Sequence, residues 1–255
     1  MVMRGDSLPR AGIRHAAEKV NSNLTDTPTK PVNVWNDASR DTARPWAPDR
    51  IWYHFARKLL KDAHLPPGRA LDLGCGVGEF MEALNECGYD VCGLDGQPEQ
   101  VVRVYEHGGR AAVADLEAPL PFGESSFDLV TCLEVIEHIA RAEHLFSEAW
   151  RVLASRGHLV LSTPNFSVWQ NRVRYWIGSG PVNEGAHLRF FTPHTLKAGL
   201  TAAGFRIVAQ QSFGPLTGFN VVRRLLGRRS VYVRIPRRLE PLFAEHMLYL
   251  AQKRP

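Results

Sequence analysis

The sequence predicts an α/β fold with a doubly wound, mostly parallel sheet. Apolar runs of strand length alternate with amphipathic helical patterns along most of the chain, and acidic residues follow several of these runs. After the first run, a loop with Gly74, Gly76 and Gly78 allows a sharp turn and a close approach of the backbone to a ligand. Ligands of such folds bind at the carboxyl ends of the strands, so this loop predicts a nucleotide-type site.

Length and composition indicate one domain with a tail. A chain of 255 residues with 44% hydrophobic residues can form a proper core. We expect residues 1–44 to form a flexible arm, because they are polar and their apolar residues show no period, and residues 45–255 to form the folded domain. The start lacks the apolar core of a signal peptide, and no run approaches the roughly 20 apolar residues of a membrane span. A soluble, cytoplasmic protein is the expectation.

The cysteines predict neither a disulfide framework nor a zinc site. No C-x-x-C pair occurs, and three of the four cysteines fall in or beside predicted strands or the glycine loop. We expect reduced thiols at Cys75, Cys87, Cys92 and Cys132.

The positive charge of the chain belongs to one segment. The formal charge is +5, but residues 223–238 hold seven arginines and no acid, and without them the charge falls to −2. Within a predicted basic insertion at residues 213–245, Val221, Val222, Leu225 and Leu226 form a narrow apolar stripe between arginine pairs. A helix at 221–238 could lie on a membrane surface, contact RNA or cover the substrate site, while a solvated face or a subunit contact is the default interpretation.

Helical and strand periods place the elements in order. A helix follows Pro48, capped by Asp49, with Ile51, Trp52 and Phe55 on its apolar face. The N-terminal half then predicts strands at 70–73, 90–94 and 111–114 and helices at 77–87 and 98–107. The C-terminal half predicts strands at 127–133, 158–163, 205–212 and 247–251 and helices at 141–153, 166–177 and 192–203.

Three acids at successive strand ends indicate the kind of ligand. Asp72 would repel a pyrophosphate at a helix N-terminus but suits a cationic, phosphate-free ligand with an ammonium group, such as S-adenosylmethionine. Asp95, 21 residues after Gly74, can reach ribose hydroxyls. Asp115 can accept from an adenine amino group while Leu116 fits against the ring. Each acid alone could be an ordinary turn residue, but the three together are far less common by chance.

Five motifs in order resemble the class I S-adenosylmethionine-dependent methyltransferases over residues 50–253. They are Ala-Leu-Asp-Leu-Gly-Cys-Gly-Val-Gly, Gly-Leu-Asp, Ala-Asp-Leu, Pro-Phe-x-x-x-Ser-Phe-Asp-Leu-Val and Glu-Val-Ile-Glu-His. The resemblance implies a Rossmann-like sheet of seven strands with the last strand antiparallel. It also implies cofactor contacts from Asp72, Gly74, Cys75, Gly76, Asp95, Gly96, Asp115, Leu116 and Glu134.

Two later segments resemble subfamilies with different acceptors. Ser-Thr-Pro-Asn at 162–165 and His-Leu-Arg-Phe-Phe-Thr at 187–192 resemble ubiquinone-type O-methyltransferases, MetW-like proteins and small-RNA 2′-O-methyltransferases. We expect O-methylation of a small molecule such as a sugar, a phenol or a biosynthetic intermediate. One alternative is a metal-assisted RNA 2′-O-methyltransferase, although no separate RNA-binding domain or stacking motif is visible. The other is a MetW-like partner protein that binds the cofactor without transferring a methyl group.

The segment from Glu134 to His138 holds the first catalytic candidates. If Glu134 opens a helical turn, Glu137 and His138 project to the same side. His138 would lie next to the methyl position and could serve as a base or orient the acceptor. In small-RNA methyltransferases a Glu-x-x-Glu-His group with a later His holds a divalent ion, and the resemblance matches Glu134, Glu137, His138 and His187 to it. Capping, solvent exposure and a backbone hydrogen bond are the structural alternatives.

A loop after the fifth predicted strand holds the remaining candidates. His187 and Arg189 precede Phe190 and Phe191, and an aromatic and basic loop of this kind could hold a sugar, a phenol or an anion. The alternative is that the two phenylalanines attach the loop to the core.

Overall fold

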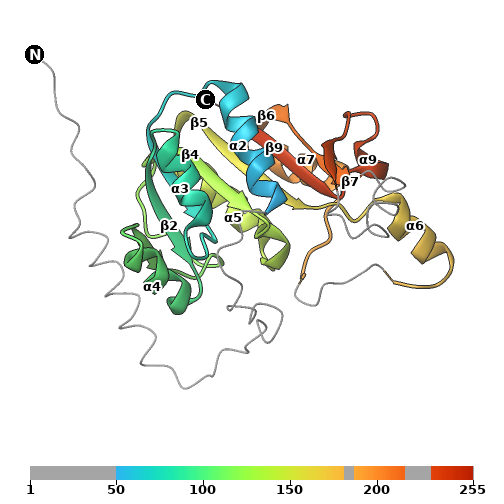
Figure 1. The fold of residues 1–255 in the computed structure, drawn as a ribbon, viewed down its shortest axis with the longest axis horizontal. Coiled ribbons are helices and arrows are strands. Elements are labelled where there is room, and N and C mark those ends of the chain that lie inside the picture. Colours follow the sequence, from blue (N-terminus) through green and yellow to red (C-terminus); the bar gives the residue numbers. More distant parts are fainter. Residues whose placement is uncertain (1–49, 181–186, 216–230, 255) are drawn as a thin grey trace, which may run out of the picture.

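The computed structural model describes residues 50–180, 187–215 and 231–254, which form a sheet with helices on both faces (Figure 1). Its strands lie in the order β3-β2-β1-β4-β5-β9-β7-β8, and β6 also pairs with β9, on the edge opposite β5. Strands β1 to β5 pair in parallel, whereas β9 is antiparallel to both β5 and β6. The predicted doubly wound sheet with an antiparallel last strand is therefore confirmed.

The strand bounds agree with the sequence pattern except near residue 212 and at the start of β5, which begins at Leu153, five residues before the predicted start at His158. The strands are β1 (Arg69–Leu73), β2 (Asp90–Asp95), β3 (Ala111–Val113), β4 (Phe127–Leu133), β5 (Leu153–Pro164), β6 (Phe205–Gln210), β7 (Phe213–Pro215), β8 (Tyr232–Arg234) and β9 (His246–Lys253). The strand predicted at 205–212 ends at Gln210. A separate strand at Phe213–Pro215 follows it and pairs with Tyr232–Arg234. The described residues thus add a short antiparallel pair to the seven predicted strands.

Local signals decide where the helices begin and end. The helices are α2 (Ile51–Ala63), α3 (Glu79–Glu86), α4 (Pro98–Glu106), α5 (Ala142–Val152), α6 (Trp169–Trp176), α7 (Pro193–Ala202) and α9 (Glu240–Phe243). Helix α3 starts two residues later than predicted because Gly78 is left-handed, with φ 88°. Helix α6 starts later than predicted after a turn in which the side chain of Asn165 accepts from the backbone of Ser167. Helix α7 begins with a capping box between Thr192 and Thr195.

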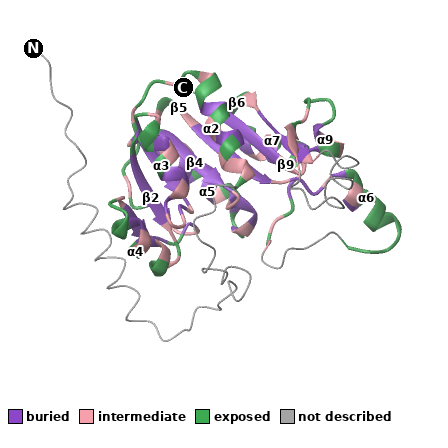
Figure 2. Cartoon of the chain, in the orientation of Figure 1, coloured by how far each residue is buried: buried purple, intermediate pink, exposed green. Residues whose placement is uncertain are grey.

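Alternate residues of the strands face two different sets of helices. One face packs on α5 and α7 and the other on α2, α3 and α4, so Leu159 and Leu161 of β5 lie in one core and Val160 lies in the other. Figure 2 shows the sheet buried between these layers, with exposed residues on the outer sides of the helices. We call the two sides of the sheet the α2 face and the α5 face.

Several sequence predictions concern residues that the structure does not describe. The N-terminal arm, the proposed cap Asp49 and the apolar stripe at 221–226 lie outside the described ranges. The described parts of the predicted insertion form β7, β8 and α9, with Arg237 and Arg238 exposed. Among the described helices, none has the length and apolar character required to span a bilayer.

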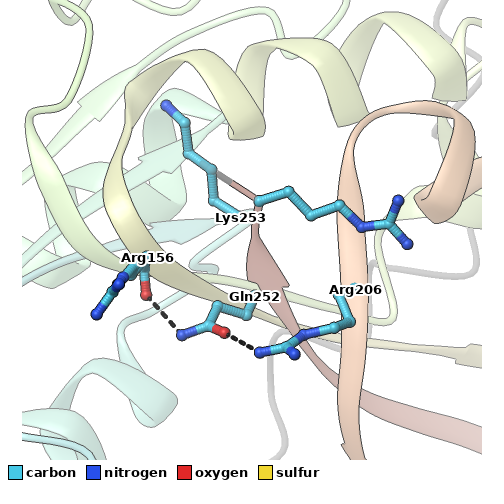
Figure 3. Close-up of a pocket in the computed structure, with 5 residues that line it drawn as sticks. Arg156, Arg206, Gln252 and Lys253 are labelled. Carbon is cyan, nitrogen blue, oxygen red and sulfur yellow. Dashed lines mark hydrogen bonds between the residues drawn. The ribbon is translucent and has the colours of Figure 1, made fainter.

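A basic cavity lies at the amino edge of the sheet, away from the glycine loop. It has a volume of about 680 Å³ and is lined by Arg156, Arg206, Gln252, Lys253 and Arg254. Figure 3 shows that its charged ends point in different directions: Lys253 turns toward α5, where it bonds to the backbone oxygen of Leu153, while Arg206 bonds to Gln252. The cations do not converge on one point, so the cavity lacks the geometry of an anion site.

The glycine loop provides a matched pair of stability tests. A Cβ at Gly74 would lie 2.4 Å from a methyl of Val135, whereas a Cβ at Gly76 would meet nothing within 4 Å; both residues have positive φ. We expect Gly74→Ala to lower the free energy of unfolding by about 2–5 kcal/mol and Gly76→Ala by about 1–2 kcal/mol, because only the first adds a clash to the left-handed strain. Urea denaturation measures both, and equal losses would contradict the close packing of Val135.

Candidate active site

The glycine loop is hydrogen-bonded to the neighbouring strand β2, and its backbone at Gly76 is accessible to a ligand. The backbone N–H groups of Gly74 and Cys75 both donate to the carbonyl of Leu94, at 2.7 and 3.0 Å. The thiol of Cys75 is buried toward Gly93, so Cys75 presents only its backbone to a ligand. Open space beside Gly76 leaves room for a ligand against the main chain.

Asp72 is a buried carboxyl at the start of this loop. It is 3% exposed, and its Oδ1 accepts from the hydroxyl of Thr131 at 2.5 Å. Burial raises its pKa to about 7; the hydrogen bond from Thr131 opposes this rise and the charge of Asp95 adds to it. A cationic group placed beside Asp72 would favour the ionised carboxylate, so the site fits an ammonium group.

Asp95 and Asp115 occupy the ends of the next two strands. Asp95 accepts from the backbone of Gly76 and of Gln97, each at 2.9 Å, and so holds the loop while retaining lone pairs for a further donor. A Cβ at Gly96 would lie 3.8 Å from the carbonyl of Ala114, so the ends of β2 and β3 approach closely. Asp115 is exposed and accepts from the backbone of Glu117 at 2.8 Å. Its neighbour Leu116 is buried.

Glu134 does not open a helical turn, so the condition under which Glu137 and His138 would project to its side is not met. It is left-handed, with φ 55°, and the turn that follows is a short 3-10 helix at Ile136–His138. Its backbone N–H donates to the carbonyl and hydroxyl of Ser162, and its Oε1 accepts from the same hydroxyl at 2.7 Å. Its Oε2 lies 3.0 Å from Nδ1 of His246. These contacts stabilise a strained conformation that a helical turn would not require.

The segment that begins at Glu134 lies directly against the glycine loop. Val135 approaches Gly74 so closely that a side chain at position 74 would overlap it. Glu134, Glu137 and His138, which follow β4, therefore lie close to the residues that fit the cofactor.

Glu137, His138 and His187 come together, as the sequence predicted. One ligand atom from each lies within 4.8 Å of the other two, and the rings of His138 and His187 are 4.9 Å apart. Glu137 is 1% exposed and accepts from the hydroxyl of Thr163 at 2.9 Å. Burial, followed by the charge of Glu134, raises the pKa of Glu137 well above its usual value. Glu134, the fourth predicted ligand, is not in this group.

Arg189 and the phenylalanines hold the loop that carries His187. The guanidinium of Arg189 donates to the carbonyl of Ala140 and to the carboxylate of Glu143. The backbone N–H of Arg189 also donates to the carbonyl of Glu137 at 2.9 Å. Phe191 is buried, and Phe190 is 46% exposed. These contacts support a positioning role for Arg189.

The two glutamates lie on opposite faces of the sheet. Ser162 and Thr163 are consecutive residues of β5, so their side chains point to opposite faces. Ser162 shares the α2 face with Asp72 and bonds Glu134, whereas Thr163 bonds Glu137 on the α5 face. We call Glu134, Ser162 and His246 the α2-face cluster, and Glu137, His138 and His187 the α5-face cluster.

Helix α2 contributes two residues that the sequence did not predict as site residues. Trp52 lies with its ring centroid 5.9 Å from that of His246, and Tyr53 stacks on Phe80 at 5.2 Å. Burial raises the pKa of Tyr53, the nearby Arg50 opposes the rise, and the charge of Asp72 adds to it. The first turn of α2 therefore extends from the cofactor side of the edge to the α2-face cluster.

His246 was also missed, although the topology gives a signal for it. An antiparallel last strand starts at the edge where the parallel strands end, and His246 is the first residue of β9. Its ring stacks on Phe213, with centroids 5.1 Å apart and planes 12° apart.

Comparisons with known proteins agree with this geometry. A family model described as a methyltransferase domain matches residues 48–210. A ubiquinone biosynthesis O-methyltransferase of Azorhizobium caulinodans is 33% identical over 184 residues, which are 67% of this chain and 72% of that protein. The corresponding protein of Idiomarina loihiensis is 32% identical over 59% of this chain and 68% of its own length.

Solved structures share the fold at lower sequence identity. An S-adenosylmethionine-dependent methyltransferase of Mesorhizobium loti has a TM-score of 0.56 and 23% identity, over 78% of this chain and 98% of that one. A methyltransferase of Thermotoga maritima, described as a possible histamine N-methyltransferase, has a TM-score of 0.58 and 20% identity over 79% of this chain and 89% of its own. With the family match, these findings show that the chain belongs to the class I S-adenosylmethionine-dependent methyltransferases.

Proposed function

We propose that the protein methylates a hydroxyl oxygen of a small phenolic molecule. The observation that carries this proposal is the meeting of imidazoles, carboxyl groups and aromatic rings beside the glycine loop. Imidazoles and carboxylates can bind a hydroxyl and remove its proton, and the ring of Trp52 beside His246 suits a planar body. The names of the curated relatives, which are ubiquinone biosynthesis O-methyltransferases, also support it.

On this proposal the chain holds the cofactor along the ends of β1, β2 and β3. Asp72 would bind the ammonium group, and the backbone of Gly74, Cys75 and Gly76 would lie against the ligand. Asp95 with Gly96 would bind the ribose. Asp115 with Leu116 would bind the adenine. When bound, S-adenosylmethionine supplies a methyl group on a positively charged sulfur.

The contribution of the protein to the reaction is mainly positioning and proton removal. Holding two reactants in line and excluding water supplies much of the rate enhancement of a displacement reaction. His138, with its Nε2 4.0 Å from Oε1 of Glu137, is the candidate to take the hydroxyl proton. The ring of His187 lies 4.9 Å from that of His138. Arg189, through its bond to Glu143, holds the loop that positions His187.

The α5-face cluster also favours a second candidate function, a metal-assisted transfer. A carboxylate and two imidazoles suit a divalent ion, which would polarise the acceptor hydroxyl. The cluster offers three ligands, and the raised pKa of Glu137 means that a metal would have to displace a proton.

Labelling of cell extracts tests the proposed acceptor class. We expect protein incubated with methyl-labelled cofactor and size-fractionated extract to label a small-molecule fraction that RNase does not alter. Loss of the labelled product after RNase treatment would instead support an RNA acceptor. Cofactor binding without transfer to any fraction would support a MetW-like partner role.

The buried carboxyl of Asp72 makes cofactor binding pH-dependent. Its pKa of about 7 means that a proton competes with the ammonium group below neutrality, so affinity should rise with pH up to about 8. Calorimetry in buffers of different ionisation enthalpy should detect proton release near pH 7. Asp72→Asn should lose binding, while Glu106→Gln, at an exposed acid of α4, should match the wild type. A constant affinity from pH 6 to 8.5 would contradict this role.

Metal dependence separates the two candidate chemistries. Unchanged transfer after chelation and dialysis is expected if the histidines act directly. A metal-assisted reaction would instead lose activity, and both Glu137→Gln and His187→Ala would reduce the metal retained by the protein, as measured by elemental analysis. If the untreated protein is active but elemental analysis finds no retained metal in it, the result would contradict the metal mechanism.

A further inference from the structure

His246 is an imidazole at the reaction edge to which the sequence assigned no role. It starts β9, and its backbone pairs with Pro164 at the end of β5 and with Phe213 in β7. Its side chain is 20% exposed and that of Glu134 is 14% exposed, so the pair is largely enclosed. It lies on the α2 face, the same face as Asp72, through the strand alternation described above.

Glu134 fixes the orientation of the His246 ring. Nδ1 of His246 lies 3.0 Å from Oε2 of Glu134, and the other carboxylate oxygen accepts from Ser162. A carboxylate can only accept, so Nδ1 carries a proton in this contact and the ring presents Nε2 on its opposite side. The left-handed backbone of Glu134 indicates that the carboxylate is held in place against a conformational cost.

Aromatic rings surround this imidazole. Phe213 stacks on His246, Phe55 stacks on Phe213 with centroids 4.3 Å apart, and Trp52 approaches from α2. The indole Nε1 of Trp52 is buried and has no hydrogen-bond partner among the residues that the structure describes. An unpaired buried donor is costly, and an oxygen of a ligand would satisfy it.

The charges near this group favour an uncharged ligand. Within the described ranges, Glu134 forms no ion pair with a lysine or arginine. Arg50, the cation next to the Trp52 ring, is paired with Glu79 at 3.1 Å. A carboxylate or phosphate placed beside the Glu134 carboxylate would therefore be repelled. A neutral hydroxyl on an aromatic ring meets no such penalty.

We propose that His246 binds a hydroxyl of the acceptor through Nε2, with Trp52 beside it favouring a planar, uncharged ring. His246 is then a specificity-determining residue, and Glu134 is a positioning residue that acts through it. This inference rests on the proposed O-methylation of a phenol and adds the group that recognises the acceptor.

The test uses catechol as a probe, with 1,2-dimethoxybenzene as the matched compound without hydroxyls. Calorimetry on the full chain saturated with S-adenosylhomocysteine measures binding without turnover. We expect the wild type to prefer catechol. In His246→Asn the amide can replace Nδ1 but not Nε2, so we expect at least a tenfold loss of catechol affinity, or about 1.4 kcal/mol. Cofactor affinity should stay within twofold of the wild type.

Further variants separate recognition from folding. His246→Gln places an amide near the Nε2 position and should recover part of the lost affinity, while His107→Asn, at an exposed histidine after α4, should behave as wild type. In nitrogen-15 spectra of labelled histidine, the His246 signals should report a protonated Nδ1 and should shift in Glu134→Ala. Catechol should perturb the Nε2 signal of the wild type.

The outcomes distinguish this inference from the proposed function. Equal catechol affinity in His246→Asn and wild type would overturn the role of His246 and leave phenol methylation standing. Absence of catechol binding to the wild-type complex, although S-adenosylhomocysteine is bound, would overturn the phenolic acceptor and this inference together.

Discussion

The end of β5 determines how the reactive groups are arranged. Two consecutive hydroxyl residues there point to opposite faces, and each donates to a different glutamate, at 2.7 Å from Ser162 and 2.9 Å from Thr163. Without this alternation both carboxyl groups would lie on one face and repel each other more strongly. The strand thus separates two acid–imidazole groups, one on each face of the sheet, although their acids, Glu134 and Glu137, are only three residues apart in the sequence.

The cofactor side depends on a second constraint, the burial of Asp72. Placing a carboxyl group where it is 3% exposed is unfavourable for its charged form, and the hydroxyl of Thr131 compensates only partly. On the proposed role of Asp72, a cationic ligand would provide the missing stabilisation. The same carboxylate would repel a phosphate, so this position would discriminate against phosphorylated ligands as well as attract an ammonium group.

Local signals made the fold and the place of the candidate cofactor residues at the strand ends predictable, whereas distant contacts decided the rest. The glycines, the acids at strand ends and the capping residues of α7 act through neighbours in the sequence, and the structure contains the elements that they predicted. The conformation of Glu134 depends on Ser162, 28 residues away, and on His246, 112 residues away. The spacing of residues 134–138 could not contain that information, so it could not decide whether a helical turn starts at Glu134. The role of Arg189 depends in the same way on Glu143, a partner 46 residues distant.

Adjacent residues on α2 contact two different parts of the site. Tyr53 packs on Phe80 beside the acid of the glycine loop, Trp52 packs near His246, and Arg50 joins the start of the helix to Glu79 at 3.1 Å. On the proposed binding mode, a shift of this helical turn when one ligand binds would displace the residue that faces the other ligand. Any such coupling must be reciprocal: a cofactor that tightens acceptor binding is itself bound more tightly in the presence of the acceptor. The first turn of α2 would then be a mechanical link between the two substrates.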